Sequence, residues 1–311
     1  MARKTRSAAH RVRVRALAKI NLSLRVLGTR PDGFHELRTT LQSLALHDTL
    51  TLTSVAGPMV LTCDIAACPA DESNLVWQAA ERRWRADGRA GTPVGVHIDI
   101  CKRVPIQAGL GGGSSDAAAA LRGLAVLWGT RVNDADLLRI ARGIGADVAF
   151  FFEGGTSLGV DRGDILYPLA DRQKASVVLV MPGFGVSTRD AYAWWDADHA
   201  AAEVPGARRA PTATSGAGDT TEQGNDLQPS VAARHPEIAR LVRRLARLGS
   251  THAAMSGSGS TVFGLFERQA EAIEAAAALT GRPRIVLVSP TVNRQDYRRL
   301  ARPQSVLRAP R

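Results

Sequence analysis

The sequence has few aromatic residues, few cysteines and no long apolar run. Of its 311 residues, 5% are aromatic and 3 are cysteine. The odd number of cysteines, at spacings that match neither zinc nor CxxC patterns, excludes a complete disulfide framework and favours a reducing compartment. No apolar stretch has the length of a signal peptide or reaches the ~18 residues of a membrane span. We therefore expect a cytoplasmic protein that does not associate with membranes.

The excess of positive charge lies at the two ends of the chain. The net charge is +11, from 40 basic and 29 acidic residues. Residues 1–15 contribute +6 and residues 291–311 contribute +5, so residues 16–290 are formally neutral. Basic tails of this kind suit a nucleic-acid-binding protein. That reading is disfavoured here because the tails lack the interleaved aromatic residues of a base-stacking surface.

Length and composition indicate a globular protein with a sizeable core. Hydrophobic residues make up 45% and charged residues 22% of the chain, which excludes disordered and collagen-like classes. A length near twice the usual ~150-residue unit indicates two domains or one large one. Residues 201–224 are rich in Ala, Gly, Thr and Pro without periodicity, and we interpret them as a mobile insertion.

A strand, a glycine loop and a helix follow one another in the first half of the chain. Residues 94–100 alternate between apolar and polar, and 109–113 read Gly-Leu-Gly-Gly-Gly. We expect a helix from Ser114, capped by Ser114, Ser115 or Asp116. Glycines let backbone N–H groups approach an anion, and the helix N-terminus adds a positive dipole end. The segment therefore predicts a phosphate-binding loop.

The amino-acid sequence of this segment excludes two known types of phosphate-binding loop. A Walker A loop requires Gly-Lys-Ser/Thr, and the dinucleotide fingerprint requires glycine where Ser114 stands. Protein-kinase signatures are also missing from the sequence. A flexible connector between strand and helix remains the alternative reading of the loop.

Lys19 and Asp147 are candidates for phosphoryl-transfer chemistry. In the alternating strand expected over residues 12–26, Lys19 and Asn21 share the polar side. Asp147 precedes an apolar run. Phosphoryl transfer needs a carboxylate that accepts the proton of the alcohol, and positive charge near the phosphate oxygens. Each residue also has a purely structural interpretation: Lys19 as a solvated residue on the surface of a strand, and Asp147 as a helix cap.

Three further features are ambiguous when each is taken alone. His35 fits an ordinary loop histidine, and Tyr192 fits ordinary helix packing. The second glycine loop, residues 256–260, fits either a tight turn or an anion contact.

The order of these motifs resembles the GHMP kinase superfamily. The resemblance is carried by a lysine strand near the start, by a central loop that begins at Pro105, and by a late Ser-Gly-Ser-Gly at 256–259. Four further motifs, Ala-Lys-Ile-Asn-Leu at 18–22, Arg-Pro-Asp-Gly-Phe-His-Glu-Leu at 30–37, Asn-Leu-Val at 74–76 and Gly-Ala-Asp-Val at 145–148, resemble the members that phosphorylate a cytidine diphosphate-linked methylerythritol. The resemblance runs from about residue 16 to residue 290.

The resemblance implies a role for each matching residue. Lys19 and Asp147 match the catalytic pair, and Asp147 also lies beside the substrate. The residues that match ATP contacts are Asn74, Lys102, Pro105, Gly109, Leu110, Gly111, Gly112, Gly113, Ser114 and Ser115. Those that match substrate contacts are Asn21, Phe34, His35, Tyr192, Gly257 and Ser258, with Phe34 and Tyr192 enclosing the cytosine ring and His35 reading its edge. ATP and Mg²⁺ are the implied cofactors, and no metal ligand is assigned.

The predicted organisation is an α+β, two-domain fold of the GHMP-kinase type, with its active site in the cleft between the domains. Its parts are a basic tail at 1–15, an N-terminal domain at 16–172, a C-terminal domain at 173–290 and a basic tail at 291–311. The implied reaction transfers the γ-phosphoryl group of ATP to the 2-hydroxyl of the substrate, in the non-mevalonate route of isoprenoid biosynthesis. Another small-molecule kinase, of the homoserine or mevalonate type, remains the alternative, and no oligomeric state is predicted.

Overall fold

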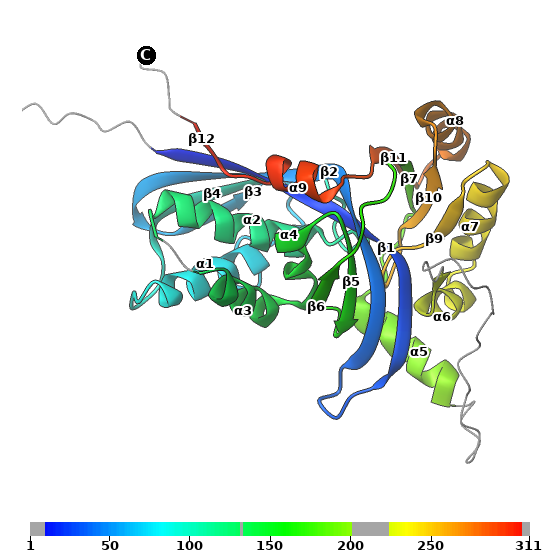
Figure 1. Ribbon diagram of the computed structural model, residues 1–311, viewed down its shortest axis with the longest axis horizontal. Coiled ribbons are helices and arrows are strands. Elements are labelled where there is room, and N and C mark those ends of the chain that lie inside the picture. Colours follow the sequence, from blue (N-terminus) through cyan, green and yellow to red (C-terminus); the bar gives the residue numbers. More distant parts are fainter. Residues whose placement is uncertain (1–9, 131–132, 201–223, 307–311) are drawn as a thin grey trace, which may run out of the picture.

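Two β-sheets and the helices packed on them form the described part of the chain, residues 10–130, 133–200 and 224–306 of the computed structural model (Figure 1). The combination confirms the predicted α+β class. Within these residues, no helix is both long enough and apolar enough to cross a membrane.

The larger sheet is built on a long antiparallel hairpin. Its main path runs β12-β1-β2-β4-β3, with β5 and β8 pairing to β2 and β1, and β6 pairing to β5. The strands are β1 (Arg11–Thr29), β2 (His35–Pro58), β3 (Val60–Cys63), β4 (Val94–Cys101), β5 (Thr156–Asp161), β6 (Ile165–Pro168), β8 (Gly224–Asn225) and β12 (Gln304–Val306). Alternation predicted β1 and β4, whereas within β2 the sequence indicates only a short strand at residues 49–53.

A bulge in β1 sends Lys19 toward the helices. Val14 and Ala16 belong to the core beneath the helices, whereas Ala18 and Ile20 belong to the core against the smaller sheet. The pairing register with β2 shifts between Leu17 and Lys19. Because side chains alternate with period two, an inserted residue exchanges the two faces of a strand. The odd positions after the bulge therefore face the helices, and Lys19, although polar, is buried.

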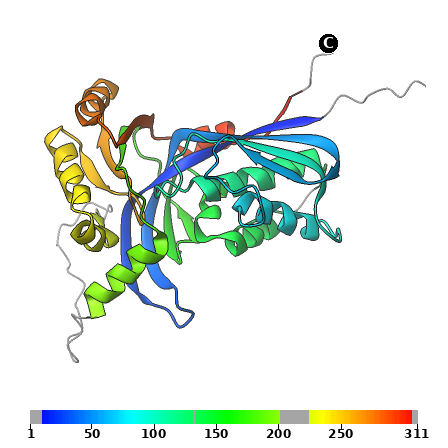
Figure 2. The same cartoon turned by 180° about the vertical axis from the view of Figure 1, so that it is seen from behind.

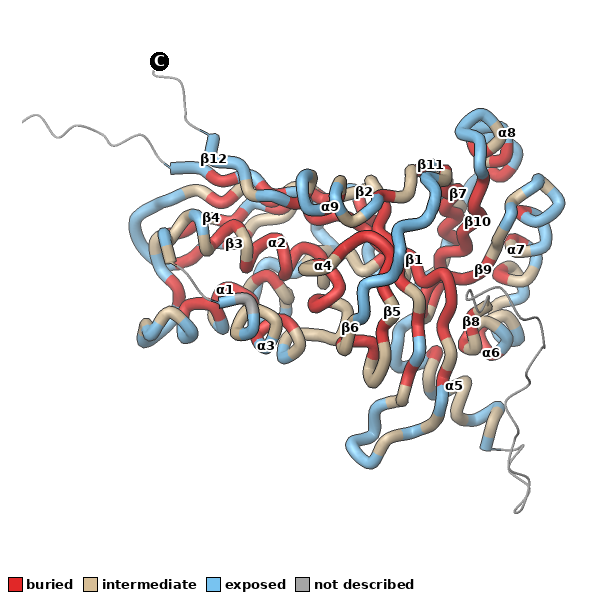
Figure 3. The backbone as a smooth tube through the Cα atoms, viewed as in Figure 1, coloured by how far each residue is buried: buried red, intermediate tan, exposed pale blue. Residues whose placement is uncertain are grey.

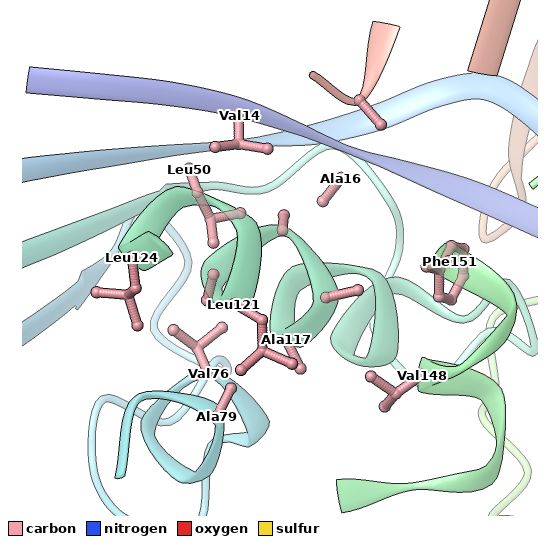
Figure 4. Packing of buried hydrophobic residues seen from close by; sticks show 14 of the residues in the cluster. Val14, Ala16, Leu50, Val76, Ala79, Ala117, Leu121, Leu124, Val148 and Phe151 are labelled. Atoms are coloured by element: carbon pink, nitrogen blue, oxygen red, sulfur yellow. The ribbon is translucent and has the colours of Figure 1, made fainter. Parts of the chain in front are cut away.

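Helices cover one face of the larger sheet. They are α1 (Leu75–Ala86), α2 (Gly112–Leu127), α3 (Asp134–Ile144) and α4 (Phe150–Glu153), with the short 3₁₀ turn η1 (Ala146–Val148). Helix α2 lies directly on β1 and β2, where Leu121 and Leu124 join Val14 and Leu50 in one cluster (Figure 4). A Cβ at Gly123 would lie 2.7 Å from Leu52 Cδ1, so glycine is required for this close approach.

The smaller sheet has the order β11-β7-β10-β9 and packs on both faces. Its elements and the helices near it are β7 (Ser176–Met181), α5 (Thr188–Ala200), α6 (Leu227–Arg234), α7 (Glu237–Arg247), β9 (His252–Met255), β10 (Val262–Phe266), α8 (Gln269–Leu279) and β11 (Ile285–Pro290). Val178 and Phe266 face these helices, whereas Leu179 and Phe263 face β1. The buried stretches of β1, β7 and β10 therefore run through the middle of the molecule (Figure 3).

Both predicted basic tails contribute to the fold, which corrects their boundaries. Strand β1 begins at Arg11, inside the tail placed at 1–15. Helix α9 (Arg294–Leu300) and β12 lie inside the tail placed at 291–311, and β12 pairs with the start of β1. Tyr297 is buried and donates from its hydroxyl to the Phe151 carbonyl at 2.6 Å. The boundaries drawn from charge alone were therefore misplaced. An arginine-rich segment can belong to the fold when one of its faces is buried. Of the predicted insertion, residues 201–223 lie outside the described residues.

Candidate active site

A lysine on β1 and an aspartate on η1, far apart in the sequence, form an ion pair. Lys19 Nζ on β1 lies 3.2 Å from Asp147 Oδ2 on η1. The Lys19 side chain is 4% exposed, whereas that of Asp147 is 38% exposed. The carboxylate is therefore accessible to a ligand, while the ammonium beneath it is almost fully covered.

Two further oxygens fix the position of the lysine ammonium. Lys19 Nζ donates to Asn21 Oδ1 at 2.6 Å and to the Gly109 carbonyl at 3.2 Å. Asn21 in turn donates from Nδ2 to Thr39 Oγ1 at 2.8 Å. The three acceptors around one buried ammonium restrict its motion, so its charge stays beside Asp147 and the glycine loop. Thr39 carries no sequence signal that predicted this role.

The central glycine loop opens helix α2, as the sequence predicted, but without the expected side-chain cap. The helix begins at Gly112, and its N-cap is Gly111 with φ 71° and ψ 19°. Among the described residues, no side chain caps this end. Ser115 instead donates from Oγ to the Leu17 carbonyl at 2.7 Å. The first N–H groups of α2 lack intrahelical acceptors, and the positive dipole end strengthens their attraction for an anion.

The glycines of this loop serve different contacts. A Cβ at Gly109 would lie 2.3 Å from the Ser256 carbonyl oxygen, and one at Gly111 would lie 2.8 Å from Phe151 Cζ. Gly113 is exposed, and a Cβ there would have only Leu75 Cδ1 near it, at 3.8 Å. Gly109 and Gly111 are therefore required by packing within the protein, whereas Gly113 lies open to a ligand.

The second glycine loop closes on the first. Ser256 Oγ donates to the Gly109 carbonyl at 2.9 Å and accepts from the Asn21 backbone N–H at 3.2 Å. Asn225 Nδ2 donates to the carbonyls of Met255 and Gly257 at 2.8 and 2.7 Å. Ser258 Oγ lies 3.1 Å from Thr188 Oγ1 on α5. The smaller sheet thus supplies one wall of the site, and Asn225, which the sequence analysis did not single out, fixes its shape.

Lys102 lies beneath the start of α2 in a buried charge cluster. Its Nζ donates to Asp48 Oδ2 at 2.6 Å and to Asp116 Oδ2 at 2.7 Å. Burial and the neighbouring Asp48 carboxylate raise the pKa of Asp116 to about 8, and the two aspartates raise the pKa of Lys102. A Cβ at Gly112 would lie 3.3 Å from Lys102 Nζ, so the ammonium is close to the loop. In this arrangement its hydrogen bonds go to the two carboxylates.

Helix α5 approaches the hairpin that joins β1 to β2 (Figure 2). Tyr192 on α5 stacks on His35 with ring centroids 4.5 Å apart and planes 26° apart. His35 Nε2 also lies 2.8 Å from Asp196 Oδ1. Burial and the Asp147 carboxylate raise the pKa of the Tyr192 hydroxyl. Phe34 is 55% exposed and lies under the Arg162 guanidinium. The structure therefore brings His35 and Tyr192 together, with no ring slot between these two.

Asn74 caps helix α1 at some distance along the chain from the glycine loop. Its Oδ1 accepts from the Val76 backbone N–H at 2.9 Å, and its Nδ2 donates to the Pro69 carbonyl at 2.6 Å. Leu75, the next residue, is the nearest neighbour to the open side of Gly113. The residue implied to contact ATP thus caps the helix that borders the loop.

Comparisons with known proteins agree with this geometry. Residues 74–155 match the family described as GHMP kinases N terminal domain, and residues 212–283 match GHMP kinases C terminal. The 4-diphosphocytidyl-2-C-methyl-D-erythritol kinase of Solibacter usitatus (strain Ellin6076) is 41% identical over 297 residues, which cover 93% of this chain and 91% of that protein.

Solved structures give the same fold. A crystal structure of 4-(cytidine 5'-diphospho)-2C-methyl-D-erythritol kinase superposes with a TM-score of 0.71 at 32% identity, covering 90% of this chain and 98% of that one. Homoserine kinase from Cytophaga hutchinsonii superposes with a TM-score of 0.65 at 19% identity, covering 98% and 100%. The second likeness is one of fold alone.

Proposed function

The chain belongs to the 4-diphosphocytidyl-2-C-methyl-D-erythritol kinases of the GHMP kinase superfamily, and from that premise we propose how its residues divide the work of phosphoryl transfer. The enzyme transfers the γ-phosphoryl group of ATP to the 2-hydroxyl of 4-diphosphocytidyl-2-C-methyl-D-erythritol, a step of isoprenoid biosynthesis. A bond forms between the hydroxyl oxygen and the γ-phosphorus as the bond from that phosphorus to the β-phosphate oxygen breaks. ADP leaves, and the hydroxyl proton needs an acceptor.

Asp147 is the proposed acceptor of that proton. Its carboxylate is the accessible member of the ion pair with Lys19, 3.2 Å away, and this pair is the observation that carries the proposal. The buried ammonium orients the carboxylate and supplies positive charge where the transferred group gains negative charge. Asn21 holds the ammonium in place from the same strand.

The start of α2 is the proposed site of the ATP phosphates. The support is the uncapped helix end at Gly111, the open position of Gly113 and the half-buried hydroxyl of Ser114 on the first turn. Leu110 is buried, and its carbonyl accepts from the Lys19 backbone N–H at 3.0 Å, which ties the loop to the strand of the catalytic lysine. Pro105, Asn74 and Lys102 border this loop as proposed nucleotide contacts.

Magnesium fits the site as a cation held mainly by the nucleotide. Among the described residues, no three acidic, histidine or cysteine side chains gather into a metal-binding cluster. Mg²⁺ commonly binds through one or two carboxylates together with substrate phosphates and water. The Ser114 hydroxyl at the start of α2 is the oxygen of this chain that would help to hold it beside the phosphates, and the ion would neutralise phosphate charge.

The cytidine end of the substrate is proposed to bind between α5 and the hairpin of β1 and β2. His35, Tyr192 and the exposed Phe34 are the aromatic groups there. Since the rings of His35 and Tyr192 are in contact, a base enclosed by Phe34 and Tyr192 requires the His35 ring to turn toward the edge of the base. Gly257 and Ser258 close the substrate side from the smaller sheet.

The variant Asp147→Asn tests the proposed base. The asparagine keeps the shape of the side chain but accepts no proton, so kcat is expected to fall ~10²–10⁴-fold. The measurement is ADP release with the cytidine-linked substrate at saturating ATP. Asp136→Asn, which removes an exposed carboxylate on α3, is the matched control and keeps full kcat. If a folded Asp147→Asn protein keeps a kcat close to the parental value, Asp147 is not the base.

The alternative of a homoserine or mevalonate kinase predicts a different response to cytidine nucleotides. We expect CDP to raise the melting temperature and to compete with the substrate, because the pocket at His35 and Tyr192 binds the base. Phosphorylation of homoserine or mevalonate, with no effect of CDP, would favour the alternative.

The contacts of the C-terminal arginines argue against the alternative of a nucleic-acid-binding protein. Arg294 donates to the Leu169 carbonyl at 3.2 Å, and Arg299 pairs with Asp296 at 2.8 Å. These guanidiniums are engaged within the protein.

A cytoplasmic location stays part of the proposal.

A further inference from the structure

A groove lined by arginines lies between α7 and α8, outside the site described above. Its volume is about 440 Å³. Five arginines contribute to its walls, together with three apolar residues: Arg240, Arg243, Arg244, Arg247, Arg284, Leu241, Ala278 and Leu279. Among the residues that the structure describes, none that lines the groove is acidic.

Four of these arginines lie on one side of α7. Arg240, Arg243, Arg244 and Arg247 follow the spacing i, i+3, i+4, i+7, which places side chains on the same face of a helix. Like charges at this spacing destabilise a helix. The dipole at the C-terminal end offsets the repulsion only in the last turn, where Arg244 and Arg247 lie. The helix therefore carries a repulsion that its own structure leaves uncompensated.

These four guanidiniums also have no acidic partner within the described part of the chain. Other exposed arginines do: Arg139 pairs with Asp136 and Arg268 pairs with Glu271, each three residues away on its helix. Of the five arginines in the groove, Arg284 alone pairs with an acidic residue in the described ranges, with Glu237 Oε1 at 2.6 Å from its Nε. The other four have no carboxylate partner among those residues and can bind an anion.

The smaller sheet separates this groove from the active site. Leu241 and Leu279 belong to the core between α7, α8 and one face of that sheet. Leu179 and Phe263 on the opposite face pack toward β1. Figure 1 shows α7 and α8 on the far side of β7 and β10 from β1. An anion in the groove therefore does not occupy the glycine loop.

We propose that this groove binds a small anion with two or three linked phosphate groups, either free or esterified to an organic alcohol. Guanidinium groups match phosphate oxygens with paired, charge-assisted hydrogen bonds. The groove volume lies within the range of about 300–1,000 Å³ that is typical of small-ligand sites. Several unpaired guanidiniums around one space favour linked phosphates over a single phosphate, because each added charge finds a partner.

The test is calorimetric titration of the full chain with sodium tripolyphosphate in metal-free buffer. No nucleotide is added, because an ATP analogue carries linked phosphates and would itself occupy the groove. Two sites per chain are expected, one at the glycine loop and one in the groove. In Arg240→Gln/Arg244→Gln the Kd of one of these sites rises roughly tenfold or more, because two charge-assisted contacts are lost, while the Kd of the other site is unchanged.

A matched control distinguishes binding in the groove from a general effect of the protein's net charge. Arg139→Gln/Arg268→Gln removes the same charge from two other helices, and its Kd is expected to stay within about twofold of the parental value because exposed, distant charges act weakly. Both double variants keep the parental kcat, which reports that they are folded. Parallel titrations with methyl diphosphate and with pyrophosphate distinguish an esterified from a free ligand.

Three results would overturn the proposal. They are the lack of a second site in the parental protein, equal weakening in both double variants, and tight binding of a duplex oligonucleotide without binding of tripolyphosphate. The last result would assign the groove to an extended polyanion.

Discussion

Replacing Gly111 by alanine tests whether the glycine loop is shaped by contacts inside the protein. Gly111 is the N-cap of α2 with φ 71°, a conformation that costs a residue with a Cβ roughly 1–2 kcal/mol. The new Cβ would lie 2.8 Å from Phe151 Cζ and 3.0 Å from Lys19 Cγ. Phe151 is fully buried, and Lys19 is held by its ion pair, so neither moves freely.

The two costs add to a large loss of stability. Forcing extra volume into a packed site costs about 1–3 kcal/mol, so Gly111→Ala is expected to lower the free energy of unfolding by about 2–5 kcal/mol. Displacement of Lys19 also disturbs Asp147, and a misplacement of about 1 Å lowers kcat by up to about 10²-fold. The volume part of the stability loss and the loss of kcat both follow from the close approach of the new Cβ to Phe151 and Lys19.

Gly113→Ala is the matched control, two residues along the same loop. Gly113 has helical geometry, and its added Cβ would make only an ordinary contact at 3.8 Å. Alanine is favoured over glycine inside a helix by up to about 1 kcal/mol, so this variant is expected to keep or gain stability.

The assay is urea denaturation followed by tryptophan fluorescence, together with kcat from ADP release. The packing argument predicts that Gly111→Ala lowers the denaturation midpoint, whereas Gly113→Ala leaves it unchanged or raises it. Equal midpoints for Gly111→Ala and the parent would refute it, and would show that the loop yields without cost.

Two further predictions concern buried polar groups near the site. Asp116→Asn is expected to flatten the pH dependence of stability between about pH 4 and pH 8: the raised pKa, about 8 in the folded protein, means that the folded state holds a proton there that the unfolded state has released, so the parental stability falls as pH rises. Urea midpoints at several pH values measure this slope, and an unchanged slope in the variant would contradict it. Asn225→Ala removes hydrogen bonds to Met255, Gly257 and Leu227 and is expected to cost about 2–4 kcal/mol of unfolding free energy and to raise KM for the cytidine-linked substrate. An unchanged KM in this variant would show that the second glycine loop does not border the substrate.

Local patterns predicted the elements that have strong periodicity or clear end signals. The alternation from residue 12 predicted β1, and the apolar spacing after the glycine loop predicted α2. Strand β2 was predicted only in part, because residues 35–48 pair with β1 over most of their length without regular alternation. The tails were misread because charge counts carry no information on which residues pair across a sheet.

The sequence by itself determined the family and the α+β class, and it supplied the candidates for the residues that bear chemistry. These depend on residue type and on spacing along the chain, which are local properties. Only the tertiary structure decided that Lys19 faces Asp147, because a one-residue bulge in β1 exchanges the faces of the strand. It also decided that Ser256, on the loop between β9 and β10 of the smaller sheet, and Asn225, on β8 of the larger sheet, shape the same site. Such contacts join residues more than a hundred positions apart, and their geometry is set by packing between layers.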